Sequence, residues 1–119
     1  MSSRPIRIPG PDHPITIERA AGRVVVKLGD HIIADSRNAL TLREASYPPV
    51  YYIPRADADM TMLVPSTHQT YCPYKGDASY LSAEGLPNSV WSYERPYDAV
   101  VAIAGHLAFY PDRFEISVE

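Results

Sequence analysis

Proline and tyrosine are the residues that most constrain how this chain can fold. The sequence holds twelve prolines and nine tyrosines in 119 residues. Proline lacks a backbone N–H donor and interrupts helices and central strands, whereas tyrosine is favoured in half-buried strands. This balance predicts a mainly β fold in which short strands are joined by rigid turns.

The length sets the number of domains. A chain of 119 residues can build one compact domain with its own core, but not two ordinary ones. Because the first 14 residues are rich in proline, we expect residues 1–14 to form an N-terminal arm that lies on the surface or is mobile. Residues 15–119 are expected to form a single β domain.

Charge and composition argue against several classes of partner. The net charge is −3, so the chain lacks the broad positive surface with which proteins hold nucleic acids. Its longest apolar run, Ala99–Ala104, is far shorter than a membrane span, and the opening segment lacks the apolar stretch of a signal peptide. We therefore expect no nucleic-acid partner, no membrane partner and a cytoplasmic location. The sequence leaves the oligomeric state open.

Cysteine and histidine usage predicts no metal and no cofactor. A single cysteine cannot form an internal disulfide, and it cannot supply a zinc site that needs several closely spaced ligands. The four histidines are scattered along the chain at His13, His31, His68 and His106. We expect neither a structural metal nor a cofactor.

Turn residues divide the rest of the chain into about eight short strands and one or two short helices. The first third is predicted to form successive hairpins around Ala21-Gly22 and Gly29-Asp30, and the end to form a hairpin around Pro111-Asp112. Asp98 begins a predicted helix, buried on all sides, that Gly105 ends. Residues 57–63 fit either a short helix or an irregular strand.

The stretch Thr70–Tyr80, T-Y-C-P-Y-K-G-D-A-S-Y, carries the strongest signal for a polar site. It places the only cysteine, a lysine, a carboxylate and three tyrosines around a turn that proline and glycine enforce. Lys75 precedes Gly76, so its ammonium and nearby backbone N–H groups can meet an anionic group. A solvated turn lysine is the alternative.

Five separated motifs resemble the DUF427 family, in the same order along the chain. They are A-D-S-x-x-A-L, Y-Y-I-P-R-A-D, Y-C-P-Y-K-G-D-A-S-Y, W-S-Y-E-R-P and I-A-G-H-L-A-F-Y. The resemblance covers roughly residues 15–119 and implies a compact β domain of the Mss4-like or β-tent kind. The family has no settled activity, although it has been labelled nucleotidyltransferase-like.

Candidate site residues follow from these motifs. Three residues are candidates for catalysis: Cys72 as a nucleophile, Lys75 as the charged group that neutralises an anion, and His106 as an acid or base. Burial and helix capping are the structural alternatives for Cys72 and His106. Aromatic and charged side chains near them are candidates for ligand binding. These candidates are Tyr52, Arg55, Asp57, Lys75, Tyr80, Trp91 and Tyr93.

Two classes of function fit this pattern. The first is a site for a small anionic or polar ligand, with or without catalysis. The second is a non-catalytic module whose tyrosine-rich face binds another protein. A nucleotidyltransferase-like enzyme is a weaker alternative, because only Asp57 and Asp59 offer the spaced carboxylates that such enzymes use.

Overall fold

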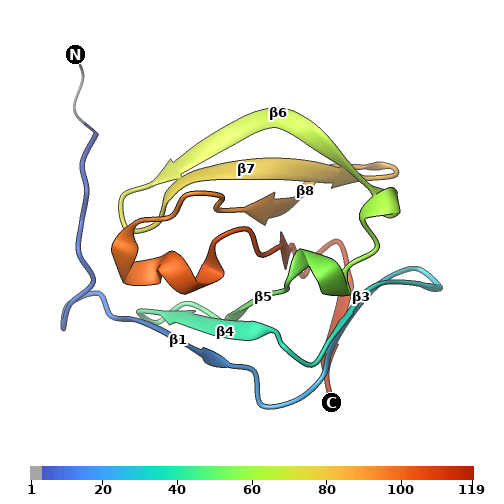
Figure 1. Cartoon of the computed structure of the whole chain (residues 1–119), viewed down its shortest axis with the longest axis horizontal. Coiled ribbons are helices and arrows are strands. Elements are labelled where there is room, and N and C mark those ends of the chain that lie inside the picture. Colours follow the sequence, from blue (N-terminus) through green and yellow to red (C-terminus); the bar gives the residue numbers. More distant parts are fainter. Residues whose placement is uncertain (1–3) are drawn as a thin grey trace.

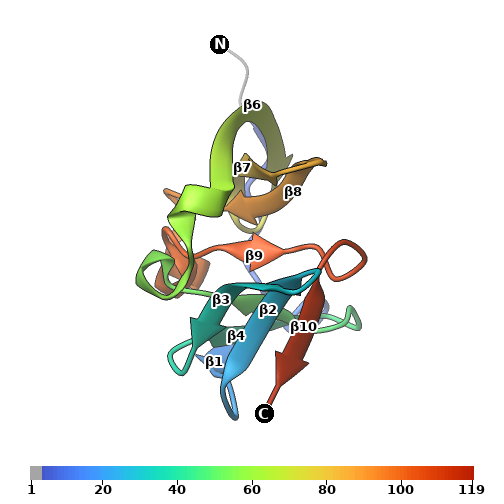
Figure 2. The same ribbon diagram turned by 90° about the vertical axis from the view of Figure 1, so that its right-hand side faces the viewer.

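Ten short strands form three small antiparallel sheets in the computed structural model, which describes residues 4–119 (Figure 1, Figure 2). The first sheet has the order β1 (Ile15–Arg19), β4 (Leu40–Glu44), β5 (Val50–Tyr52). The second has the order β10 (Glu115–Val118), β2 (Val24–Leu28), β3 (His31–Ser36). The third has the order β6 (Leu63–Cys72), β7 (Gly76–Ala83), β8 (Leu86–Ser92), β9 (Ala108–Phe109). The predicted mainly β class is confirmed, and the Mss4-like or β-tent architecture stays a prediction.

Every helical segment within residues 4–119 is a short 3₁₀ helix. The three are η1 (Arg55–Asp57), η2 (Met60–Met62) and η3 (Asp98–Ile103). Gly105 follows η3 with a φ of +72°, the left-handed conformation expected where a helix ends. The expectation that this helix is buried on all sides is wrong, because Val100 and Ile103 are buried while Val101 is 60% exposed. A 3₁₀ helix repeats every three residues, so it turns only one in three inward.

The β2–β3 hairpin is confirmed, whereas the hairpin predicted before it is wrong. β2 pairs with β3 around Gly29, but β1 pairs with β4 in a different sheet. Gly22 explains the difference, because a side chain there would overlap the Glu119 carbonyl, which accepts a hydrogen bond from the Arg23 N–H at 3.2 Å. Gly22 therefore admits the C-terminal strand beside β2 instead of making a tight turn.

The hairpin predicted at the C-terminus is also wrong. A turn does form after Tyr110, whose carbonyl accepts hydrogen bonds from the N–H groups of Arg113 and Phe114. The strands on either side diverge, however, since β9 pairs with β8 and β10 pairs with β2. Phe114 is buried against Phe109 with ring centroids 5.2 Å apart, and this packing turns the chain from the third sheet to the second.

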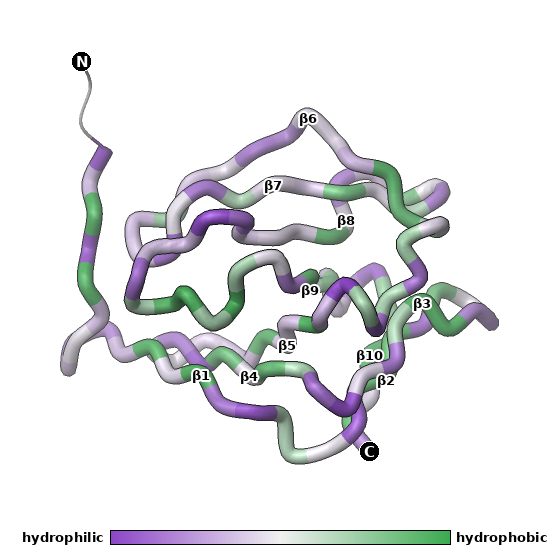
Figure 3. Tube along the Cα trace, viewed as in Figure 1, coloured by the Kyte–Doolittle hydropathy of each residue, from purple (hydrophilic) through white to green (hydrophobic). Residues whose placement is uncertain are grey.

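The predicted hairpin around Pro73–Asp77 is confirmed as β6–β7. Gly76 has a φ of +105°, which suits glycine and lets the chain reverse within a few residues of Cys72. β6 is an outer strand of the third sheet, and most of it is hydrophilic and exposed (Figure 3). The turn of this hairpin therefore faces the interior of the domain, whereas most of β6 faces solvent.

Two clusters of buried side chains form the core. The apolar cluster lies mainly between the second and third sheets and is built around Val24, Val26, Ile33, Ile53, Val90 and Leu107. The tyrosine cluster lies between the first sheet, the third sheet and η3, and it consists of Leu42, Tyr52, Ala78, Tyr80, Tyr93, Val100, Ile103 and Ala108. Figure 1 shows η3 between the layer of β1 and β4 and the layer of β7 and β8.

Residues 4–14 run along one edge of the domain, beside the β6–β7 turn (Figure 1). The Arg7 N–H donates to the Pro73 carbonyl at 2.9 Å, and both guanidinium nitrogens of Arg4 contact the Asp77 carboxylate at 2.6 and 2.8 Å. These contacts hold the described part of the expected arm on the surface. Residues 1–3 of that arm lie outside the described residues. In the described part of the chain, no helix combines the length and the apolar character needed to cross a bilayer.

Candidate functional site

The side chain of Lys75 points inward from the turn between β6 and β7. The Lys75 N–H donates to the Cys72 carbonyl at 3.2 Å, and the Lys75 carbonyl accepts from the Tyr97 N–H at 3.0 Å. These two bonds fix the backbone on both sides of the turn. Only 7% of the residue is exposed, which is rare for lysine unless its charge has a partner.

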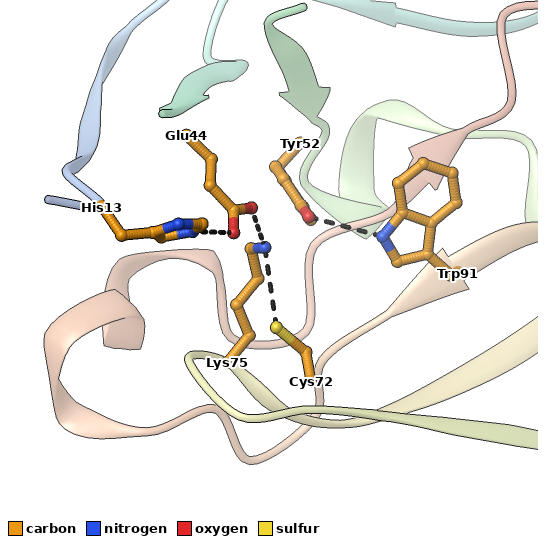
Figure 4. Close-up of polar contacts among 6 residues, drawn as sticks. All are labelled: His13, Glu44, Tyr52, Cys72, Lys75 and Trp91. Carbon is orange, nitrogen blue, oxygen red and sulfur yellow. Dashed lines mark hydrogen bonds and ion pairs between the residues drawn. The ribbon is translucent and has the colours of Figure 1, made fainter. Parts of the chain in front are cut away.

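Glu44, at the end of β4, is that partner (Figure 4). One carboxylate oxygen accepts from Lys75 Nζ, and the other lies 2.7 Å from Nε2 of His13 on the N-terminal arm. Cys72 Sγ lies 3.9 Å from Lys75 Nζ on the other side of the ammonium group. Burial alone would raise the pKa of Glu44, but the hydrogen bonds from Lys75 and His13 outweigh it and hold that pKa below its usual value.

A pocket of about 290 Å³ opens directly onto this ion pair. Its floor is polar and its walls are aromatic, formed by residues that come from β4, β5, β7, β8 and the β6–β7 turn. Its charged and aromatic lining includes Glu44, Tyr52, Lys75, Tyr80, Trp91 and Tyr93, and Leu42, Tyr47, Pro48, Val50 and Tyr110 complete it. The tip of the hairpin thus carries its lysine into the region where the first and third sheets meet.

The aromatic walls hold one another at fixed angles. Trp91 packs edge-on against Tyr52 with centroids 6.4 Å apart, and its Nε1 donates to the Tyr52 hydroxyl at 3.4 Å (Figure 4). On its other side, Trp91 tilts over Tyr110 at 4.5 Å. The Tyr80 hydroxyl is anchored by the Thr70 hydroxyl, 3.0 Å away. Such packing fixes the shape of the pocket before any ligand arrives.

The Tyr93 hydroxyl differs from its neighbours, because no hydrogen bond of this group is found among the residues that the structure describes. Tyr93 is 7% exposed and lines the pocket, with its ring 6.0 Å from Lys75 Nζ. Burial raises the pKa of Tyr93 and of Tyr52 above the usual value, so both groups stay protonated at neutral pH. Tyr93 therefore adds to the pocket lining an O–H donor that no described side chain is found to use.

The structure brings together five of the residues singled out in the sequence and leaves the others elsewhere. Lys75, Tyr52, Tyr80, Trp91 and Tyr93 all line the pocket. Cys72 touches the lysine but is not among the lining residues.

The remaining three candidates make structural contacts away from the pocket. Nη1 of Arg55 donates to the Gly105 carbonyl at 2.6 Å, and Asp57 accepts from the Ser36 hydroxyl at 2.7 Å. Nδ1 of His106 lies 3.0 Å from the Ala104 carbonyl, beside the end of η3. These residues stand in or next to the sequence motifs that suggested a site, but in the fold their side chains contact backbone carbonyls, the Ser36 hydroxyl and, for Arg55, also the Glu94 carboxylate.

Sequence reasoning missed Glu44 and His13. Glu44 had a readable signal, because strand alternation places it on the same face as Leu42, which is buried. An acidic side chain on the inner face of a strand needs a partner of opposite charge. His13 had no such signal, since only the docking of the N-terminal arm brings it to Glu44.

Within residues 4–119, no three side chains of histidine, cysteine, aspartate or glutamate come together closely enough to hold a metal ion.

Comparison with known proteins identifies the family. A family model described as a domain of unknown function (DUF427) matches residues 16–119. No curated protein matches the chain. The match begins just after His13, so the pocket walls and the ion pair lie within it, whereas the histidine that contacts Glu44 comes from outside it. This family model matches nearly the whole chain, and the protein therefore belongs to the DUF427 family.

Proposed function

We propose that this domain binds a small molecule in the pocket above Lys75 and Glu44. Oxygen atoms of the ligand accept hydrogen bonds from donors of the pocket. The observation that carries the proposal is a buried ion pair that opens onto an aromatic pocket instead of being sealed in the core. A buried ion pair is a poor source of stability, because removing two charges from water costs about as much as their attraction returns. Its place at the floor of a pocket supports a role in binding.

The hydrogen-bond inventory of the pocket favours an acceptor on the ligand. Lysine has three N–H donors, and Lys75 uses one on Glu44 and directs another at the weak acceptor Cys72 Sγ. The Tyr52 hydroxyl accepts from Trp91, which leaves its own proton free, and the Tyr93 hydroxyl is unpaired among the described residues. Both oxygens of Glu44 are already engaged. Donors therefore exceed acceptors, as a carboxylate or carbonyl ligand requires.

The charge balance limits how anionic that ligand is. Glu44 offsets the charge of Lys75, so the pocket floor carries little net positive charge. A single carboxylate or a neutral carbonyl fits this balance better than a phosphate chain, which usually needs several cations or a bound metal. The same reasoning weakens the nucleotidyltransferase-like alternative. In support, Asp59 accepts from its neighbour Thr61 and Asp57 from Ser36, so the two carboxylates face different partners.

Binding is favoured over catalysis because the candidate nucleophile and the candidate acid or base do not line the pocket. Cys72 lies behind the lysine, and His106 lies at the end of η3. The protein-interaction alternative needs a flat, exposed tyrosine face. Tyr52, Tyr80 and Tyr93 are instead buried around a cavity, which favours a small ligand. A cytoplasmic location also stays a prediction, in keeping with the free thiol of Cys72.

The experiment uses Trp91, the only tryptophan of the chain, as an internal reporter. We would titrate the protein with small carboxylates, amides and alkyl phosphates while recording tryptophan fluorescence and the melting temperature. A ligand present at about 100 times its Kd should add about 2.7 kcal/mol to the free energy of unfolding. The proposal predicts that acids or amides change both signals, and that phosphates do so more weakly.

Two variants separate site binding from general effects. Tyr93→Phe removes only the unpaired hydroxyl and should weaken binding about tenfold, as expected for one lost hydrogen bond. The double variant Glu44→Gln, Lys75→Met removes both charges together, so neither is left buried alone, and it should weaken binding further. Tyr97→Phe and Lys27→Met are the matched controls outside the pocket and should bind normally. Equal affinities in all four variants would contradict the proposal.

A further inference from the structure

A second pocket adjoins the first one and differs from it in polarity. It has a volume of about 420 Å³ and shares Tyr47, Pro48, Val50 and Trp91 with the first pocket. None of the residues lining it is charged, and their exposed atoms are mostly apolar carbon. The two pockets are therefore neighbours on one face of the molecule, one with an ion pair at its floor and the other hydrophobic.

The apolar pocket is built where the three sheets come together. The loop between β4 and β5 supplies Pro49, the third sheet supplies Phe109 in β9, and β10 of the second sheet supplies Ile116. Figure 2 shows β9, the last strand of the third sheet, between β8 and the strands of the second sheet. Because these residues belong to different sheets that also pack in the core, the pocket is held in place by the fold. Tyr47, which is 64% exposed, borders both pockets.

We infer that the two pockets bind one amphiphilic small molecule, an aryl or alkyl carboxylate or carbonyl compound. Its polar head lies against Lys75 and Tyr93, as the proposed function requires, and its apolar tail passes Trp91 into the pocket beside Ile116. Three observations support a single occupant: the shared wall, the excess of donors in one pocket and the absence of charge in the other. Polar and apolar parts of a ligand each find matching surroundings only in this orientation.

Size supports the same conclusion. Small-molecule sites usually enclose about 300 to 1,000 Å³. The first pocket alone is just below that range, and it becomes an ordinary ligand site only together with the second. A head group without a tail should therefore bind weakly, and each buried methylene should strengthen binding about fourfold.

The test is a titration series at constant head group, with Trp91 fluorescence as the signal. The probes are acetate, butyrate and hexanoate, followed by benzoate and 3-phenylpropionate. For the wild-type protein we expect affinity to rise about 250-fold from acetate to hexanoate if all four added methylenes are buried. Ile116→Thr, which makes the tail pocket more polar, should remove most of this rise. Val118→Thr is the matched control on the same strand. It should leave the rise in affinity unchanged, since Val118 does not line the pocket.

The outcomes separate this inference from the proposed function. If every acid binds with equal affinity and Tyr93→Phe weakens the binding of each, the proposed site at Lys75 stands. The proposed site for the tail, in the apolar pocket at Ile116, is then refuted. If hexanol binds as well as hexanoate and Tyr93→Phe has no effect, both are refuted. A proline-rich peptide that changes Trp91 fluorescence while no acid does would assign the surface to a protein partner and overturn the inference. Melting curves of each variant confirm that it is folded before it is titrated.

Discussion

The apolar cluster and the tyrosine cluster divide the core into two regions of different chemistry. The fully buried members of the apolar cluster are aliphatic or phenylalanine side chains, and none carries a polar atom. The tyrosine cluster holds three tyrosines, and the buried Lys75 and the half-buried Glu44 lie beside it. Burial of a hydroxyl or a charge costs free energy unless it is bonded, whereas burial of an aliphatic side chain contributes about 1.5 to 3 kcal/mol. The apolar cluster therefore serves stability, and the tyrosine cluster shapes a site.

The largest expected effect is on the apolar cluster. Ile33 is completely buried, whereas its neighbour Ile32 is 49% exposed. Ile33→Ala should lower the free energy of unfolding by about 4 kcal/mol, because it removes buried methylenes and leaves a cavity. Ile32→Ala should cost less than about 1 kcal/mol. Urea unfolding of the two variants measures both values, and equal losses would contradict the assignment of this cluster to the core.

Glu44→Gln probes the charged edge of the tyrosine cluster. At pH 7 it should cost about 3 kcal/mol, because Lys75 is left buried without its counter-charge. The pKa of Glu44 is lowered in the folded protein, so its contribution is complete above the unfolded value of 4.5 and is lost as the pH falls through the folded value. The difference between wild type and variant should therefore shrink below about pH 4.5.

Urea unfolding measured from pH 7 down to pH 3 checks this dependence. Glu18→Gln is the control for the loss of an exposed carboxylate. A loss for Glu44→Gln that stays constant over the whole range would mean that the ion pair does not contribute as described.

Gly76→Ala tests whether the β6–β7 turn beside Lys75 requires the conformation that glycine adopts there. A Cβ at this residue would lie 3.5 Å from the Arg95 carbonyl oxygen, which is an ordinary contact, so the cost comes from the φ of +105°. We expect a loss of about 2 kcal/mol in the free energy of unfolding. Gly10→Ala should cost almost nothing, since Gly10 has no positive φ and a Cβ added there would meet no atom within 4 Å. Thermal unfolding compares the two, and equal melting temperatures would show that the turn adapts.

The smallest effect on stability is expected for Tyr93→Phe. Its hydroxyl is unpaired in the described structure, so its removal should change the free energy of unfolding by less than about 1 kcal/mol. Tyr80→Phe breaks the hydrogen bond to Thr70 and should cost about 1 kcal/mol. Paired denaturation curves measure the difference. A larger loss for Tyr93→Phe would mean that its hydroxyl supports the fold rather than a ligand.

The parts of the fold that local sequence determines were predictable. Pro73 and Gly76 specify the β6–β7 turn, and Gly105 marks the end of η3. Strand pairing between distant segments was not, because the role of Gly22 depends on where Glu119 lies. The same glycine pattern serves a tight turn or a close backbone approach, and only the packed fold decides between them.

The candidate site follows the same division. Lys75 and the tyrosines of Thr70–Tyr80 stand out in the sequence because their residue types are unusual around a turn. Glu44, by contrast, lies 31 positions from Lys75 and 31 positions from His13. A charge partner at such a distance leaves no local pattern. Strand alternation offered the one usable signal, the acidic residue on the inner face of β4.

The central claim is that the pocket above Lys75 and Glu44 is a ligand site. The most direct measurement is an NMR titration of the ¹⁵N-labelled protein with 3-phenylpropionate, in which the single indole N–H of Trp91 gives one identifiable signal. The account predicts that this signal shifts together with the amides of Lys75 and Gly76. A spectrum in which they stay fixed, or in which only amides near the separate hollow at His31 and Glu84 move, would contradict it.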